Sequence, residues 1–150
     1  MRRVRTGATS VLVAGIAVCG ATAIASARMS QGAGKTTVDG VFTEAQAKRG
    51  DAIYARSCAS CHGPELSGAD VAPALTGTDF VSNWNDLSLG DLFERIRIGM
   101  PADKPGSLSR QDNADVLAFM LFKAGFPAGA AELPTQLEGL KDIKFVAQKK

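Results

Sequence analysis

The chain has 150 residues, 45% of them hydrophobic and 21% charged, with a formal net charge of +2. This length suits one small domain. Three of the basic residues are arginines within the first five positions, and without them 14 basic side chains face 15 acidic ones, a net charge of −1. Nucleic-acid-binding proteins carry a basic stripe, so this balance excludes that class of partner.

The first 27 residues have the three parts of a secretory signal peptide. A positive n-region with three arginines (residues 2–5) precedes an apolar h-region (residues 11–24), and an Ala-Ser-Ala cleavage site follows at residues 25–27. The sequence therefore predicts a mature chain that begins at Arg28 and is exported to the periplasm. The alternative is an uncleaved membrane anchor, although the apolar run is shorter than the ~20 residues that span a bilayer.

Residues 28–42 are rich in Gly, Ser and Thr, a composition typical of a flexible leader. A helix start follows, because Thr43-Glu44-Ala45-Gln46 has the form of a capping box. We expect this helix to end near Ser57.

The motif Cys58-Ala59-Ser60-Cys61-His62 comes directly after this helix and contains the only histidine of the chain. Cys-x-x-Cys-His is the attachment site of a c-type haem. The two thiols form thioether bonds to the haem, and the adjacent imidazole ligates the iron from one side. Helical spacing places Cys58, Cys61 and His62 on one face. The sequence therefore predicts one covalent haem c.

Three other interpretations of the cysteines fit the sequence less well. A redox-active Cys-x-x-Cys pair belongs in a βαβ setting, and no strand-rich pattern surrounds this one. A zinc site needs four ligands, but the chain has three Cys and one His, and Cys19 lies in the predicted signal peptide. A structural disulfide suits an exported protein but does not explain why the histidine follows Cys61.

Two further helices are predicted after the motif. Residues 63–85 are punctuated by Gly and Pro and indicate an irregular wrap with little regular structure. Capping boxes at Ser88 and Ser109 then start helices that end near Gly99 and Ala124. No convincing alternating strand pattern is present, so the predicted fold is all-α.

The segment 126–150 extends beyond this helical domain, which we place at residues 43–125. It contains five well-spaced large apolar side chains: Leu133, Leu137, Leu140, Ile143 and Phe145. These are too apolar for a free tail, so we expect the extension to pack on the domain. Docking of a partner protein is the alternative use of such a surface.

The second iron ligand cannot be a histidine of this chain, which leaves Met29, Met100 and Met120 as candidates. Met29 lies in the leader, and Met120 lies on the apolar stripe of a helix, where methionine usually fills a core. Met100 follows a helix end in a loop and can direct its sulfur to the iron. We therefore predict His62 and Met100 as the axial pair, a set that raises the reduction potential of the iron.

With these features the chain resembles class I cytochrome c over about residues 43–125. Gly50, Tyr54 and Phe119 are similar to the family's residues where its first helix crosses its last. The segment Pro73-Ala74-Leu75-Thr76-Gly77 resembles a family motif, and the resemblance implies that the Pro73 carbonyl accepts a hydrogen bond from the Nδ1–H of His62. Met100 matches the family's distal methionine. The implied fold packs helices around one covalent haem.

A narrower resemblance concerns two segments, 84–95 and 100–109, which are similar to small cytochromes that serve quinoprotein (PQQ-dependent) dehydrogenases. In class I proteins a tryptophan or arginine often bonds a haem propionate. Trp84 either does so here or forms part of the cavity wall. Arg95 and Arg97 are interpreted as solvated charges on a helix face.

The sequence thus predicts a periplasmic monohaem electron carrier, and not an enzyme, that exchanges single electrons with a donor dehydrogenase and an acceptor protein. Two rival functions stay open. One is a tightly bound cytochrome subunit of a dehydrogenase complex, and the other is a haem sensor or enzyme with an open iron site. A membrane is a partner only if the signal segment is not cleaved.

Overall fold

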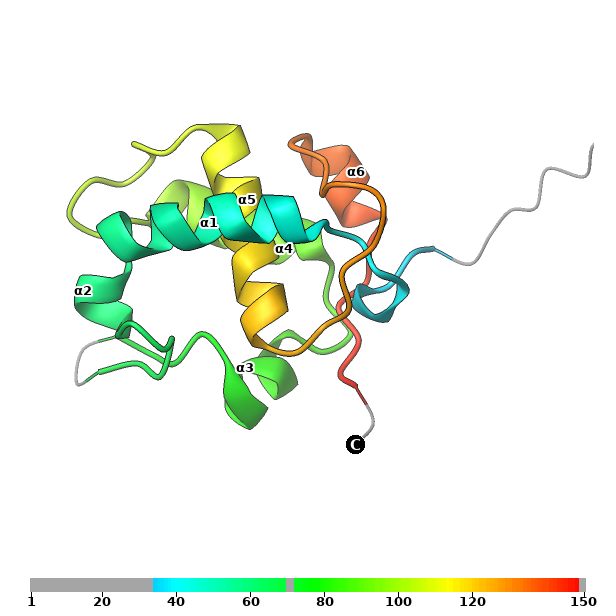
Figure 1. Cartoon of the computed structure of the whole chain (residues 1–150), viewed down its shortest axis with the longest axis horizontal. Coiled ribbons are helices and arrows are strands. Elements are labelled where there is room, and N and C mark those ends of the chain that lie inside the picture. Colours follow the sequence, from blue (N-terminus) through cyan, green and yellow to red (C-terminus); the bar gives the residue numbers. More distant parts are fainter. Residues whose placement is uncertain (1–33, 70–71, 149–150) are drawn as a thin grey trace, which may run out of the picture. The chain divides into compact units, whose positions relative to one another are not determined.

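A computed structural model describes residues 34–69 and 72–148 (Figure 1). The predicted signal peptide (residues 1–27), Cys19 and Met29 lie outside these residues. The described segments form a short 3₁₀ helix and six α-helices: η1 (Thr37–Asp39), α1 (Glu44–Ser57), α2 (Ala59–His62), α3 (Gly77–Trp84), α4 (Leu89–Gly99), α5 (Arg110–Lys123) and α6 (Leu137–Lys141). Only isolated β-bridges occur within these segments. The predicted all-α fold is confirmed.

The helices α1 and α5 cross each other at the centre of the domain (Figure 1). Gly50 permits this crossing, because a Cβ at that position would lie 1.9 Å from the backbone oxygen of Asp115. One turn further, the rings of Tyr54 and Phe119 pack with their centroids 5.3 Å apart. The glycine and the two aromatic residues therefore occupy the places that the resemblance to class I cytochrome c implied.

An ionic group beside Gly50 fastens the same crossing around the buried carboxylate of Asp115. Arg49 donates from Nε and Nη2 to the Asp115 carboxylate at 2.8 and 2.9 Å, and it also pairs with Glu132 at 2.8 Å. Gln111 adds a third hydrogen bond to Asp115. These bonds raise the pKa of Arg49, first through Asp115 and then through Glu132. The Asp115 side chain is only 4% exposed, so these donors supply the hydrogen bonds that a buried carboxylate needs.

Side-chain caps start the three long helices where the sequence predicted. The hydroxyl of Thr43 accepts from the N–H of Gln46, and complete capping boxes are present at Ser88 and Ser109. Such caps satisfy backbone donors that the first helical turn leaves without partners.

Two helices were missed by the sequence analysis. The segment 63–85 was expected to be irregular, but it contains α3, whose one buried residue is Phe80. The extension contains α6, which packs against α4 and buries Leu140. Both helices are short, so their stability comes from packing and not from local signals.

Part of the predicted flexible leader (residues 28–42) differs from the prediction. Residues 28–33 lie outside the described residues, but Thr37, Val41 and Phe42 are buried. The reason is pairing with the far end of the chain, because the N–H of Thr37 donates to the carbonyl of Lys144 at 3.0 Å. Composition alone does not reveal such a distant partner.

The extension after residue 125 is largely part of the core. Leu133, Leu140, Ile143 and Phe145 are at most 5% exposed, and Leu137 is half-buried.

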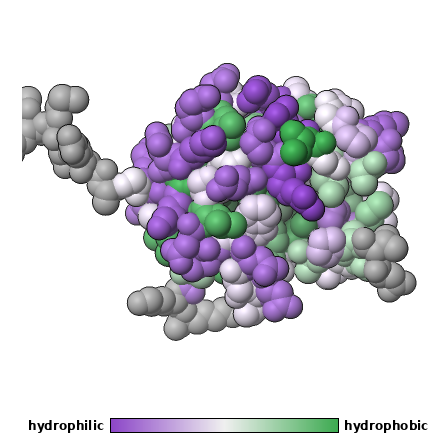
Figure 2. Space-filling view, turned by 180° about the vertical axis from the view of Figure 1, so that it is seen from behind, coloured by the Kyte–Doolittle hydropathy of each residue, from purple (hydrophilic) through white to green (hydrophobic). Residues whose placement is uncertain are grey.

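The face shown in Figure 2 is mainly hydrophilic, with its most hydrophobic residues scattered over it. In the described part of the chain, no helix has the length and apolar character needed to cross a membrane.

Candidate haem-binding site

The Cys-x-x-Cys-His motif begins with Cys58, which lies between α1 and α2, and its other four residues form α2. The N–H of Cys58 donates to the carbonyl of Tyr54 at 2.8 Å, and the N–H of His62 donates to the carbonyl of Cys58 at 3.0 Å. Both thiols are free, with Cys58 half-buried and Cys61 exposed. Burial, followed by the nearby Cys61, raises the pKa of Cys58 to about 11, so its free thiol stays protonated at neutral pH.

Tyr54 fixes the chain just after the motif. Its hydroxyl donates to the carbonyl of Gly63 at 2.6 Å, which ties α1 to the residue that follows His62. Burial is the main cause that raises the pKa of Tyr54 to about 12, so the hydroxyl remains a donor over the physiological range. The same tyrosine thus serves both the α1–α5 crossing and the motif.

The imidazole of His62 is buried and held by a backbone carbonyl. Its Nδ1 lies 2.8 Å from the oxygen of Pro73, the contact that the resemblance implied. A neutral imidazole that donates from Nδ1 leaves Nε2 with a lone pair for a metal.

A tight loop brings Pro73 to this position. The N–H of Gly68 donates to the carbonyl of His62 at 2.9 Å, and Gly68 has φ of +77°. A Cβ there would lie 2.6 Å from the nitrogen of Ala74, so only glycine fits.

A cavity of about 1140 Å³ opens beside His62. Its wall contains side chains from α1 to α5 and from the loop after α4, including Cys58, Cys61, His62, Pro73, Leu75, Phe80, Trp84, Leu92, Ile96, Met100, Val116 and Met120. The volume lies above the ~300–1,000 Å³ of usual ligand pockets, so it suits a large cofactor.

The structure brings two of the three candidate methionines to this cavity. Met100 is half-buried at the end of α4, where its N–H donates to the carbonyl of Ile96 at 2.9 Å. Met120 lines the cavity from α5 and is 2% exposed. Lining the cavity therefore does not distinguish the two, although Met100 alone lies on a loop.

The three polar candidates, Trp84, Arg95 and Arg97, differ in whether they line the cavity. Trp84 lines the wall at the end of α3, as either of its two interpretations requires. Arg97 is a helix-face charge that donates hydrogen bonds to Glu94 at 2.7 and 2.8 Å, which lowers the pKa of this carboxyl. Arg95 is exposed but also lines the cavity, a position that its interpretation as a solvated charge did not include.

Two residues of this region were missed by the sequence analysis. Phe80 is 5% exposed, lines the cavity and packs its ring 6.4 Å from that of Trp84. Asn113 is fully buried, and its Nδ2 donates to the carbonyls of Leu108 and Ser109, which fixes the end of the Met100 loop to α5. Phe80 precedes Trp84 by four residues, about one helical turn, and this spacing was the available signal, whereas Asn113 gave none.

The cavity fits a haem by three observations. Two thiols and an imidazole line it, the Nδ1 of that imidazole faces the Pro73 carbonyl so that Nε2 is the nitrogen left for a metal, and most of the wall is apolar. A haem held there would have Cys58 and Cys61 for covalent attachment and His62 for the iron, with a methionine available from the wall.

The comparisons with known proteins agree with this site. Residues 45–120 match the profile of a family described as "Cytochrome C oxidase, cbb3-type, subunit III", and this range includes the motif and Met100. The match spans half of the chain, which therefore belongs to this family of cytochrome c domains. The predicted cytochrome c-like fold is confirmed, and the family implies a covalent haem c.

A solved structure gives a weaker likeness. A chain in the crystal structure of the sulfane dehydrogenase SoxCD from Paracoccus pantotrophus is 22% identical, with a TM-score of 0.47. The match covers 71% of this chain and 60% of the SoxCD chain, and at this similarity it carries no argument about function. None of the curated proteins matches the sequence. The narrower resemblance to cytochromes of quinoprotein dehydrogenases stays a prediction.

Proposed function

We propose that this chain is a periplasmic monohaem c-type cytochrome that carries single electrons through a haem ligated by His62 and Met100. The observation that carries the proposal is one cavity that gathers both cysteines, His62 and a loop methionine. When bound, haem c supplies an iron that cycles between Fe(II) and Fe(III).

The residues of this chain would perform four tasks around the group. Cys58 and Cys61 would hold it covalently, and Cys61 is exposed, so a redox partner could approach the site from this side. The Pro73 carbonyl orients His62. The apolar wall excludes water, which limits rearrangement on electron transfer.

The methionine ligand can be tested with one substitution at two positions. Met100→Leu and Met120→Leu change the same side chain in the same cavity, and leucine keeps most of its volume. We expect the oxidised wild-type holoprotein to show the weak near-red band of Fe(III)–methionine coordination. Met100→Leu should abolish this band, whereas Met120→Leu should keep it.

Two other results would contradict the proposal. Loss of the band only in Met120→Leu would move the ligand to α5. A wild type with high-spin iron that binds carbon monoxide readily would contradict a carrier with two strong axial ligands and favour a sensor or enzyme.

The finer elements of the proposal have separate tests. Similarity of residues 84–95 and 100–109 to quinoprotein partners supports a PQQ-dependent dehydrogenase as donor, so such an enzyme should reduce the holoprotein in rapid mixing. Co-purification with a large subunit would instead support a complex-bound cytochrome. Export predicts that protein from the periplasmic fraction begins at Arg28, as N-terminal sequencing would reveal.

A further inference from the structure

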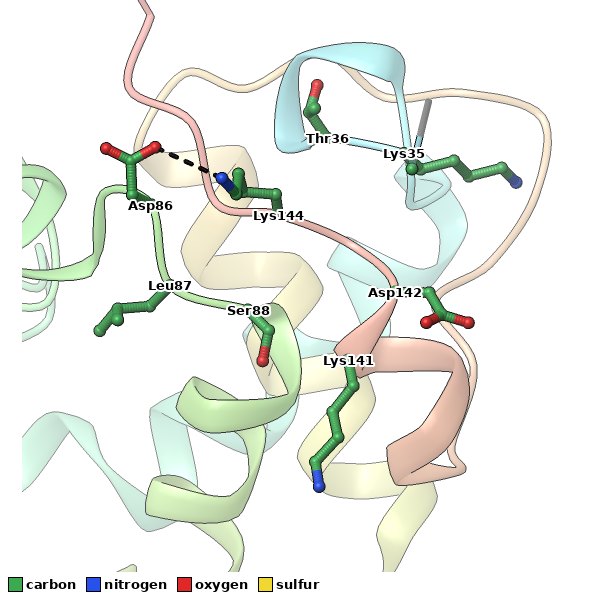
Figure 3. A pocket seen from close by; sticks show the side chains of 9 residues that line it. Lys35, Thr36, Asp86, Leu87, Ser88, Lys141, Asp142 and Lys144 are labelled. Atoms are coloured by element: carbon green, nitrogen blue, oxygen red, sulfur yellow. Dashed lines mark ion pairs between the residues drawn. The ribbon is translucent and has the colours of Figure 1, made fainter. Parts of the chain in front are cut away.

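The segment 143–147, which we call the C-terminal strap, lies between two distant parts of the chain (Figure 3). On one side, Lys144 exchanges backbone hydrogen bonds with Lys35 and Thr37 at 2.8 and 3.0 Å. On the other side, the N–H of Phe145 donates to the carbonyl of Leu87, and the N–H of Asp86 donates to the carbonyl of Phe145, both at 2.8 Å.

The strap is joined to the end of α3 by these bonds and by one more. The N–H of Ala147 donates to Oδ1 of Asn85, the residue that caps the C-terminus of α3, at 2.8 Å. Trp84 and Leu87, which flank this cap, both line the cavity. The strap therefore holds the part of the chain in which one cavity wall ends.

Phe145 also supports this wall through its side chain. It is fully buried, and its ring meets that of Phe80 edge-on, with the centroids 6.2 Å apart. Phe80 in turn packs 6.4 Å from Trp84, and both line the cavity. Phe126 supports the far side of Phe145 at 5.2 Å. A row of rings thus leads from the strap to the cavity.

We propose that Phe145 is a positioning residue for the haem, because it holds Phe80 and Trp84 of α3 against the cavity. This inference rests on the proposed function, since it assumes that the cavity holds haem c. Phe145 itself does not line the cavity, so it would act through the two residues of α3.

The physical consequence concerns water at the cavity wall. If Phe145 loses its edge contact with Phe80, α3 opens more often and admits water beside the group. A more polar surrounding favours the oxidised iron, which carries the greater charge, so the reduction potential falls.

The experiment uses the full-length holoprotein with Phe145→Leu, and Phe42→Leu as its matched control. Phe42 is also fully buried but does not line the cavity. Leucine keeps both sites apolar and close to their original volume, so both variants should fold. Hydrogen exchange of the α3 amides reports the opening of the wall, and the reduction potential reports the surroundings of the iron.

We expect Phe145→Leu to speed α3 exchange by at least about tenfold, or ~1.4 kcal/mol in opening free energy. Its ratio of reduced to oxidised protein should fall about threefold at a fixed potential, which is ~28 mV for one electron. Phe42→Leu should leave both quantities near the wild-type values. Equal changes in the two variants, or no change in Phe145→Leu, would overturn the positioning role. A wild-type protein without covalent haem would overturn the proposed function as well. This result can be told apart from the two outcomes above, because it concerns the wild type and not the variants.

Discussion

The two sides of the haem cavity are built in different ways. The side that carries the motif depends on the crossing of α1 and α5, where Gly50 lets the two backbones meet and Tyr54 packs on Phe119. The α3 side depends on the strap, which reaches it from the far end of the chain. The first side is built by two long helices whose starts are encoded in capping residues, whereas long-range hydrogen bonds and one row of aromatic rings build the second.

The largest expected effect breaks the first side. Gly50→Ala places a Cβ 1.9 Å from the Asp115 oxygen, so α1 and α5 must separate. We expect a loss of about 3 kcal/mol in unfolding free energy, the upper part of the range for overpacked cores. Denaturant titration measures this loss. Gly99→Ala is the control, because nothing lies within 4 Å of its Cβ position, and it should be neutral or stabilising. Equal results for the two glycines would contradict the role of Gly50.

The ionic fastening of the same crossing gives the next effect. Arg49→Met leaves the buried carboxylate of Asp115 with Gln111 as its side-chain donor, which should cost about 2 kcal/mol. Lys123→Met removes an ion pair with the exposed Glu65 and should cost ~0.5 kcal/mol or less. Thermal unfolding of the two variants compares them. A similar loss of stability in both variants would mean that the burial of Asp115 does not increase the cost of removing its partner.

The strap side can be loosened without touching its aromatic rings. The hydroxyl of the buried Thr37 donates to the carbonyl of Val146 at 3.0 Å and accepts from its N–H at 2.9 Å. Thr37→Val keeps the shape but removes both bonds, so we expect a loss of about 1 kcal/mol. Hydrogen exchange should quicken in the strap and leave the α1–α5 crossing unchanged. Thr78→Val, on an exposed position of α3, is the control. Faster exchange spread evenly over the domain would show that the two sides are not separate units.

The smallest effect is a pH dependence on α4. Arg97 lowers the pKa of Glu94 through their hydrogen bonds. The stabilisation by this pair is therefore present above the ordinary carboxyl pKa and is lost as pH falls through the lowered one. Arg97→Gln should be slightly less stable than wild type at neutral pH, and the two should converge in acid. A constant difference down to acidic pH would contradict this origin. This pair does not belong to the α3 side of the cavity, so its effect shows how much an ordinary surface ion pair contributes to stability.

The same contrast between the two sides explains which parts of the structure could be predicted from the sequence. The capping boxes at Ser88 and Ser109 and the Cys-x-x-Cys-His motif are local patterns, whereas the Gly50 crossing was implied by the resemblance to class I cytochrome c; the structure has each of them where it was expected. The helix α3, the packing of residues 34–42 and the role of Phe80 were missed, because the partners that order them lie far away in the sequence. The choice between Met100 and Met120 stays a prediction, since both reach the cavity.

The bond between Thr37 and Val146 joins residues 109 positions apart. Closing so long a loop is entropically costly, so contacts of this kind form late in folding. The cysteine motif precedes the strap in the chain and therefore emerges first during synthesis. A chain that has been made as far as the motif already contains both thiols, but the strap that completes the α3 side of the cavity is still missing. Because of this order along the chain, a cofactor can enter through the side of the cavity that the strap completes last, and the strap then retains it.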